Sequence, residues 1–227
     1  ARGATWFQAE DLDKIATEWF ETPQFEFAEP VKGGDYVMGV DISGGIGLDY
    51  SAVTVIDTAT RQPVYIERNN RLAPHAWAAR VATIGHRYNH ALCLAESNNH
   101  GHSFLREMQV LSYPRMWANR DGSWWVTSTQ SKLDDGLREI VESHIIQRLD
   151  QATLGELRSL EVKKTTPQAP SGLHDDLAMS VALAYRCLRD APTMLRMRAA
   201  GNRIDDHKMH MQAERRRRQP LAGRISR

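Results

Sequence analysis

Two short apolar segments, far apart in the chain, each carry an acidic residue at the end. The first covers residues 36–42 and places Asp41 near its end, and the second covers residues 91–96 and ends at Glu96. Short apolar runs of this kind are typical of buried β-strands. If the two strands are neighbours in one sheet, their ends lie about 5 Å apart. The pattern therefore predicts a sheet that gathers carboxylates at one edge.

The remaining periodicity predicts an α/β fold. Residues 35–42, 52–57 and 64–68 are β-branched runs with short connections, which predicts three antiparallel strands in a meander. Apolar residues at three- and four-residue steps predict helices over 11–20, 74–88, 101–108, 131–149, 153–160 and 174–188. A further strand is predicted over 124–127 and a loop over 165–172. The expected architecture is a mixed sheet, with three antiparallel strands and parallel strands, and with helices packed on its faces.

A third acidic position opens the last predicted helix, at Asp175 and Asp176. A helix that begins over the ends of the two acid-bearing strands would bring these carboxylates to Asp41 and Glu96. Their mutual repulsion is costly unless a cation is bound. Hard oxygen ligands without a Cys or His cluster suit Mg²⁺ or Mn²⁺. Each acid alone also fits a turn or a helix cap, so the prediction of a metal site depends on the joint arrangement.

Charge is distributed unevenly along the chain. Residues 1–185 hold 17 Lys and Arg against 24 Asp and Glu, and residues 186–227 hold 12 against 4, which gives net charges of −7 and +8. The basic tail contains Arg215, Arg216, Arg217 and Arg218. It is predicted to be flexible, and a DNA clamp, a docking arm and a solubilising end are all open interpretations.

Other functional classes find little support in the sequence. Cys93 and Cys187 stand alone in apolar surroundings, so two buried free thiols are expected rather than a zinc site. No run approaches the roughly 18 apolar residues of a membrane span, and no membrane partner is expected.

The chain resembles the nuclease domain of the large terminase subunit of tailed bacteriophages. The matching stretches occur in family order: Gly-Val-Asp-Ile-Ser-Gly-Gly at 39–45, Asp-Tyr-Ser-Ala at 49–52, Ala-Glu-Ser-Asn-Asn-His-Gly at 95–101, Thr-Ser-Thr-Gln-Ser-Lys at 127–132, Gly-Glu-Leu at 155–157 and Gly-Leu-His-Asp-Asp-Leu-Ala-Met-Ser at 172–180. The resemblance implies a ribonuclease-H-like fold and a Mg²⁺- or Mn²⁺-dependent endonuclease that cuts concatemeric viral double-stranded DNA with two metal ions. It assigns Asp41, Glu96, Asp175 and Asp176 as catalytic metal ligands and leaves open which of the last two binds directly.

The resemblance also implies a domain plan and partners. The family's ATPase precedes its nuclease, and no phosphate-binding Gly-x-x-x-x-Gly-Lys-Ser/Thr loop occurs here. Residues 1–34 are therefore expected to lead in from a missing N-terminal ATPase domain, residues 35–190 to form the nuclease domain, and residues 191–227 to form the tail. The implied partners are double-stranded DNA, the portal protein, the small terminase subunit and the ATPase domain, in the host cytoplasm at the procapsid portal.

DNA contacts are predicted around the acids. The candidates are Lys132, Asn98, His100, His174 and the four tail arginines Arg215, Arg216, Arg217 and Arg218. Ordinary alternatives are a solvated helix-start lysine, a polar turn and a helix-entry histidine.

Three rival functions remain open from the sequence. Another ribonuclease-H-like nuclease, such as a resolvase or transposase, would use the same acids. An actin-like ATP-binding domain shares the strand meander, although the chain is short for two such lobes and shows no second phosphate loop. An inactive module would serve only for docking.

Overall fold

The computed structural model describes residues 4–47, 49–97, 100–118, 130–163 and 166–191. Its largest described sheet has five strands in the order β2-β5-β4-β3-β6. Their bounds are Gln24–Glu26 (β2), Tyr36–Asp41 (β3), Ser51–Asp57 (β4), Pro63–Asn69 (β5) and Leu92–Ala95 (β6). Strands β3, β4 and β5 form an antiparallel meander, and β6 pairs with β3 in parallel. The predicted mixed sheet is confirmed.

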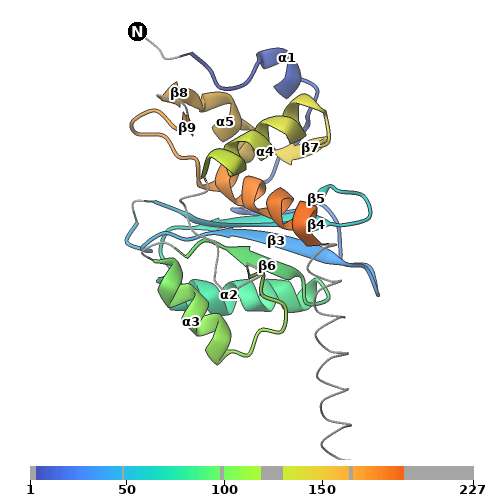
Figure 1. Cartoon of the computed structure of the whole chain (residues 1–227), viewed down its shortest axis with the longest axis vertical. Helices are drawn as coiled ribbons and strands as arrows, with labels where there is room; N and C mark the ends of the chain where they lie inside the picture. Colours follow the sequence, from blue (N-terminus) through green and yellow to red (C-terminus); the bar gives the residue numbers. More distant parts are fainter. Residues whose placement is uncertain (1–3, 48, 98–99, 119–129, 164–165, 192–227) are drawn as a thin grey trace, which may run out of the picture. The chain divides into compact units, whose positions relative to one another are not determined.

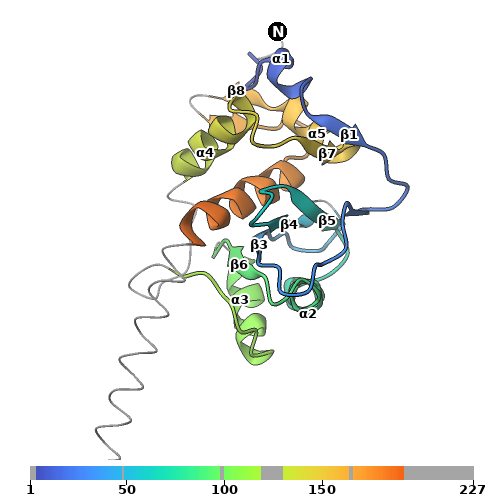
Figure 2. The ribbon, with the colours of Figure 1, turned by 90° about the vertical axis from the view of Figure 1, so that its right-hand side faces the viewer.

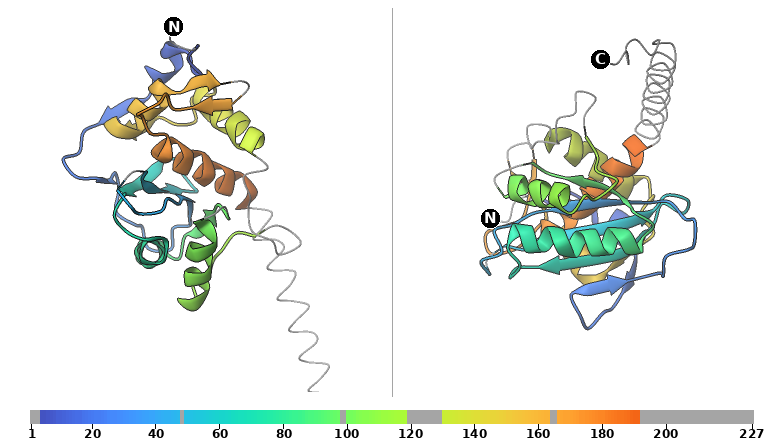
Figure 3. Two further views of the ribbon diagram at one scale, coloured as in Figure 1. Left: turned by 90° about the vertical axis from the view of Figure 1, so that its left-hand side faces the viewer. Right: turned by 90° about the horizontal axis from the view of Figure 1, so that it is seen from below.

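Helices cover both faces of this sheet (Figure 1). Helices α2 (Pro74–Arg87) and α3 (Gly101–Val110) pack against one face, side by side in the view from below (Figure 3). A helix over residues 176–191 lies on the opposite face, as the perpendicular view also shows (Figure 2). Pro74 occupies the first turn of α2, where its missing N–H has no cost.

Strand alternation decides which residues face which helix layer. Met38 and Val40 belong to the apolar core that includes Trp77 of α2, and both are fully buried. Their neighbours Gly39 and Asp41 must point to the other side, because successive side chains of a strand alternate. The face with Gly39 and Asp41 is the one covered by the helix over residues 176–191.

A further group of elements lies beyond that helix (Figures 1 and 2). It comprises helices α1 (Ala9–Leu12), α4 (Gln130–Glu142) and α5 (Gln151–Ser159), the parallel pair β1 (Ala16–Glu18) and β7 (Arg148–Asp150), and the antiparallel pair β8 (Glu161–Lys163) and β9 (Thr166–Gln168). Asp150 caps α5, since its Oδ1 accepts the N–H groups of Ala152 and Thr153 at 2.9 and 2.8 Å.

Three local predictions are wrong. The expected helix over 11–20 breaks after Asp13, and residues 16–18 instead pair with 148–150. The expected helix over 131–149 ends at Glu142, because His144 adopts a φ of +53° that a helix does not tolerate. The expected loop over 165–172 contains strand β9. In the first two cases the pairing of β1 with the remote strand β7 outweighs the local pattern, and in the third β9 pairs with the adjacent strand β8.

Several expectations remain as they were, or are confirmed. The strand predicted over 124–127 lies outside the described residues. The interpretation of residues 1–34 as a lead-in stays a prediction, although residues 24–26 within it join the central sheet. Cys93 and Cys187 are buried and unbridged, as expected. None of the described helices has the length and apolar character needed to cross a membrane.

Candidate metal centre

Asp41 and Glu96 occupy equivalent positions on neighbouring parallel strands. Val40 of β3 is in register with Ala95 of β6, and each acid is the next residue along its strand. Ala95 belongs to the core on the side of α2 and α3, as Val40 does. By alternation, Asp41 and Glu96 therefore lie on the opposite face and at the same end of the sheet. The neighbouring strands predicted from the sequence are thus found.

The helix over residues 176–191 begins at this end of the sheet. It approaches β3 very closely, since a Cβ added to Gly39 would lie 2.1 Å from the backbone N of Ala184. A hydrogen bond of 2.7 Å between the hydroxyls of Thr54 and Ser180 also joins β4 to the helix. Glycine at position 39 therefore permits the packing that brings the start of the helix to the acidic ends of the strands.

Asp41 interacts electrostatically with all the other predicted ligands. Burial of its carboxyl group raises its pKa well above the usual value, and the charges of Asp176, Glu96 and Asp175 raise it further, in that order. The N–H of Ile42 donates to Asp41 Oδ1 at 3.1 Å and opposes this shift. Three carboxyl groups thus share a region with Asp41, and each disfavours its ionisation.

The two aspartates at the start of the helix are held by backbone groups. Asp176 accepts the N–H of Tyr50 at 3.3 Å and lies 3.4 Å from Nδ1 of His174. Burial is the largest cause that raises the pKa of Asp176 to about 6, and the Tyr50 N–H opposes it. Asp175 accepts the N–H of Ala169 at 3.2 Å. Both side chains therefore have defined directions.

A cleft of about 350 Å³ opens beside these aspartates. Its lining residues are Ile42, Ser43, Gly44, Asp49, His100, Leu173, His174, Asp175 and Asp176. The neighbouring turn needs glycine, because Gly45 has a φ of +69° and a Cβ there would lie 2.1 Å from the carbonyl oxygen of Leu72. Asp41 and Glu96 are not among the lining residues, so the cleft exposes only part of the acidic cluster.

The sequence reasoning missed the role of Glu156. Its Oε2 accepts the N–H groups of Leu177 and Ala178 at 2.8 and 3.0 Å, so it caps the helix that carries Asp175 and Asp176. Burial raises the pKa of Glu156 to about 8. Arg68 lies 3.6 Å from its other oxygen and also stacks over Tyr50 at 4.7 Å. The only signal in the sequence was the Gly-Glu-Leu stretch at 155–157.

Asp49 was also missed as a site residue. It lines the cleft, and its charge raises the pKa of Asp176. The sequence signal was its place in the Asp-Tyr-Ser-Ala stretch at 49–52.

The donor chemistry of this region fits divalent cations. The cluster offers carboxylate oxygens whose charges oppose one another, which a bound cation would relieve. In the described part of the chain, no three carboxyl, imidazole or thiol groups yet converge tightly enough to surround one ion. Three of the acids, Asp41, Asp175 and Asp176, accept backbone N–H groups instead. The assignment of Asp41, Glu96, Asp175 and Asp176 as ligands stays a prediction.

The predicted DNA-contacting residues fall into two groups. His100 and His174 both line the cleft, and the His174 ring packs edge-on against Tyr50 with ring centres 5.1 Å apart. Lys132 falls in α4, but its side chain is outside the described part of the structure. Asn98 and Arg215 to Arg218 also lie outside the described residues. DNA contact by any of them stays a prediction.

Comparison with known proteins finds sequence relatives among phage large terminase subunits. No protein-family model matches the sequence. The chain is 28% identical over 158 residues to the large terminase subunit of Thermus virus P23-45, a match that covers 66% of this chain. That match spans only 31% of the relative's own length.

Solved structures share the fold. The large terminase nuclease from thermophilic phage G20c with bound magnesium matches with a TM-score of 0.69 and 23% identity, over 82% of this chain and 98% of that one. The nuclease domain of the Thermus phage P74-26 large terminase matches with a TM-score of 0.66 and 24% identity, over 81% and 95%. The resemblance predicted from the sequence and the predicted fold are both confirmed.

Proposed function

We propose that the chain is a metal-dependent DNA endonuclease of a viral genome-packaging motor. Its sequence relatives are phage large terminase subunits, and it shares the fold of their nuclease domain. One observation carries the proposal. Asp41 and Glu96 follow residues paired in register on neighbouring parallel strands, on the sheet face against which the helix that follows Asp175 packs closely. This concentration of carboxylates beside an open cleft is what metal-assisted phosphodiester hydrolysis requires.

Asp41, Glu96, Asp175 and Asp176 would hold two Mg²⁺ or Mn²⁺ ions. When bound, such ions lower the pKa of a water molecule and neutralise charge on the scissile phosphate and the leaving oxygen. Asp41 ends strand β3, next to Glu96 at the end of β6 and to the aspartates at the start of the helix, so it would be placed to hold either ion.

The chain's own groups position these ligands. The N–H of Tyr50 orients Asp176, and the N–H of Ala169 orients Asp175. Glu156 fixes the helix start from below by accepting two N–H groups. Such preorganisation matters because displacements of about 1 Å in a catalytic site are costly.

Two histidines line the cleft where the DNA backbone would bind. His174 and His100 both reach the cleft, and each can donate a ring N–H to a phosphate oxygen. Gly44 lies beside the His100 ring, since a Cβ at this position would be 3.4 Å from it. The small residue therefore leaves room for the imidazole to turn toward a phosphate.

The biological setting follows from the same homology. The proposed substrate is concatemeric double-stranded DNA, cut by the motor during packaging. The proposed partners are the portal protein, the small terminase subunit and a terminase ATPase domain, and the proposed location is the host cytoplasm at the procapsid portal. Sequence relatives that are large terminase subunits support this setting.

Plasmid digestion tests the activity. The chain is incubated with supercoiled plasmid and Mn²⁺, Mg²⁺ or EDTA, together with the single variants Asp41→Ala, Glu96→Ala, Asp175→Ala and Asp176→Ala. We expect nicking with Mn²⁺ or Mg²⁺, none with EDTA, and a loss of activity in the variants. Undiminished activity in all four variants would overturn the site, and absence of any nicking by the wild type would favour a docking module.

A further inference from the structure

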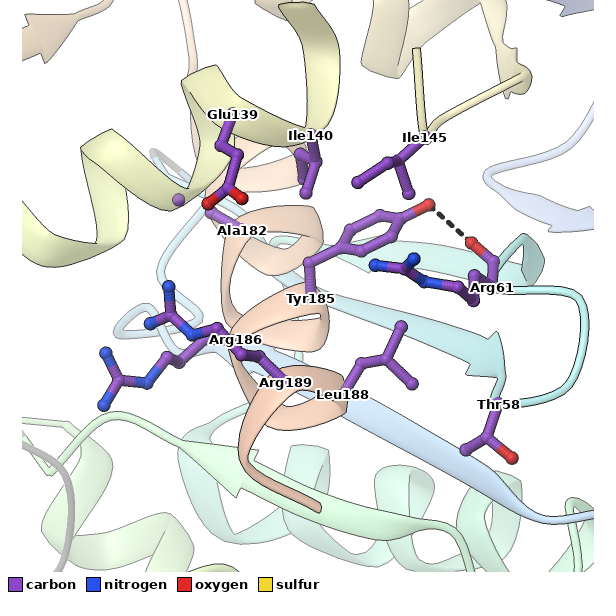
Figure 4. Close-up of a pocket in the computed structure, with 11 residues that line it drawn as sticks. Thr58, Arg61, Glu139, Ile140, Ile145, Ala182, Tyr185, Arg186, Leu188 and Arg189 are labelled. Carbon is purple, nitrogen blue, oxygen red and sulfur yellow. Dashed lines mark hydrogen bonds between the residues drawn. The ribbon is translucent and has the colours of Figure 1, made fainter. Parts of the chain in front are cut away.

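A second cleft, of about 300 Å³, lies at the other end of the helix over residues 176–191 (Figure 4). Three segments line it: the end of α4, the turn between β4 and β5, and the last turns of the helix. Tyr185, in the middle of the cleft, is nine residues from Asp176. A rise of 1.5 Å per residue places it roughly 14 Å along the helix from the acidic cluster. The two clefts are therefore separate sites.

The floor of this second cleft is apolar. Tyr185 lies between Ile140 and Ile145 on one side and Leu188 on the other (Figure 4). Ile140 and Tyr185 are buried, while Ile145 and Leu188 remain partly exposed. The Tyr185 hydroxyl donates to the carbonyl oxygen of Arg61 at 2.8 Å, which ties the β4–β5 turn to the helix. The floor is thus a fixed surface suited to an apolar side chain.

The rim of the cleft is basic. Arg186 and Arg189 extend together on one side of Tyr185, and Arg61 comes from the other side (Figure 4). Glu139 is the one acidic residue among the described lining residues. This excess of positive charge stands on a body whose residues 1–185 have a net charge of −7. The local charge therefore favours an acidic ligand at this position.

We propose that this cleft binds an acidic peptide segment of a partner protein, with an apolar side chain seated on the floor. A peptide can supply both parts, because its carboxylates pair with arginine guanidinium groups while a neighbouring leucine or phenylalanine covers Tyr185. A nucleic-acid backbone supplies phosphates but no group that would cover Ile145 and Leu188. The combination of an apolar floor and an arginine rim thus favours the peptide. No residue of the acidic cluster lines this cleft, so the proposed peptide site is independent of the proposed nuclease activity.

Fluorescence anisotropy with the full chain tests the inference. The probe is a labelled 12-residue peptide with four glutamates around one leucine, and two matched probes replace either the leucine or the glutamates by serine. The variant Arg61→Ser/Arg189→Ser removes two exposed rim charges, and Arg71→Ser/Arg106→Ser is the matched control because it removes two exposed charges outside the cleft. The tail arginines are unchanged in both variants, so unspecific attraction to them cancels.

We expect saturable binding of the Glu/Leu peptide that weakens about 10-fold in the rim variant and is unchanged in the control. Replacing the leucine by serine should weaken binding by about 10-fold or more, since it removes the buried apolar side chain. Binding that is insensitive to the rim variant, or to the leucine, would overturn the proposal. A double-stranded oligonucleotide that binds at the rim while the peptide does not would overturn it in favour of nucleic acid.

Discussion

The two ends of one helix differ in a way that the helix alone does not explain. Asp175 and Asp176 stand at the N-terminal end of the helix over residues 176–191, and Arg186 and Arg189 stand near its C-terminal end. Both placements match the helix dipole, which favours negative charge at the first turn and positive charge at the last. The helix dipole is enough to account for the charge at the arginine end, because Arg189 is exposed to solvent and Arg186 is partly exposed.

The acidic end gathers more negative charge than the helix dipole can stabilise. Asp41 and Glu96 stand at the ends of two different strands, and Glu96 is buried. Burial and three neighbouring acids disfavour ionisation of the Asp41 carboxyl group. A helix dipole worth about 1 kcal/mol does not offset several buried carboxylates. The difference between the two ends supports the proposal that the acidic end binds a cation.

The largest expected effect is a difference in plasmid-cleavage rate between variants at the two ends of the helix. Asp175→Asn/Asp176→Asn removes charge from the acidic end and should lower the rate of plasmid cleavage about 10³-fold or more, because metal ligands supply several kcal/mol of transition-state stabilisation. Arg61→Ser/Arg189→Ser at the other end should leave the cleavage rate within about 2-fold. Equal losses in both variants would mean that the two clefts act as one site.

The close packing of the helix on β3 should give the largest effect on stability. Gly39→Ala places a Cβ within 2.1 Å of the Ala184 backbone, so we expect a loss of about 3 kcal/mol and a Tm about 10 °C lower. Gly155→Ala is the matched control, since α5 leaves open space there and alanine favours a helix. Calorimetry should find the control equal to or slightly more stable than the wild type. An unchanged Tm in Gly39→Ala would contradict the described packing.

Glu156 should matter as an acceptor more than as a charge. Glu156→Leu leaves the buried N–H groups of Leu177 and Ala178 without their acceptor, at a cost of about 2 kcal/mol. Glu156→Gln retains an oxygen that can accept both, and its Tm should stay within about 2 °C of the wild type. Thermal melts in EDTA check both. A larger loss in the glutamine variant than in the leucine variant would show that the charge is what stabilises the helix start.

The last expected effect is a dependence of stability on pH. The pKa of Asp176 rises from 3.8 to about 6 and that of Glu156 from 4.5 to about 8, so the folded chain binds these protons more tightly than the unfolded chain. Their contribution to stability is therefore fully present below about pH 4 and is lost as the pH rises through 6 to 8. In EDTA we expect the Tm at pH 8 to lie below the Tm at pH 5, with a smaller difference in Glu156→Gln. A rise in Tm over this range would contradict the pKa directions.

Much of the acidic end was predictable from sequence because its signals are local. The apolar run before Asp41 and the one before Glu96 each predict a buried strand, and both strands are present in parallel register. The Asp175–Asp176 pair coincides with the start of a strongly periodic helix. The apolar runs, together with the acidic residues that follow them, were enough to predict that these acids lie at one end of a sheet.

The rest depends on contacts between remote segments. Strand β1 exists because it pairs with β7, more than 100 residues away, and no periodicity in residues 11–20 reveals this. Glu156 looks like an ordinary α5 residue until the helix over 176–191 packs beside it. The arginine-rimmed cleft is formed by the β4–β5 turn, α4 and the last turns of the helix over residues 176–191. No single stretch of the sequence therefore predicts it.

Binding of Mn²⁺ is the most direct test of the central claim that these carboxylates assemble to hold cations. Isothermal titration calorimetry at pH 7.5 compares the wild type with Asp41→Asn and with Asp57→Asn, which alters an acid at the opposite end of the sheet. We predict saturable binding in the wild type and in Asp57→Asn, and an affinity at least about 10-fold lower in Asp41→Asn. Equal affinity in all three proteins would contradict the account.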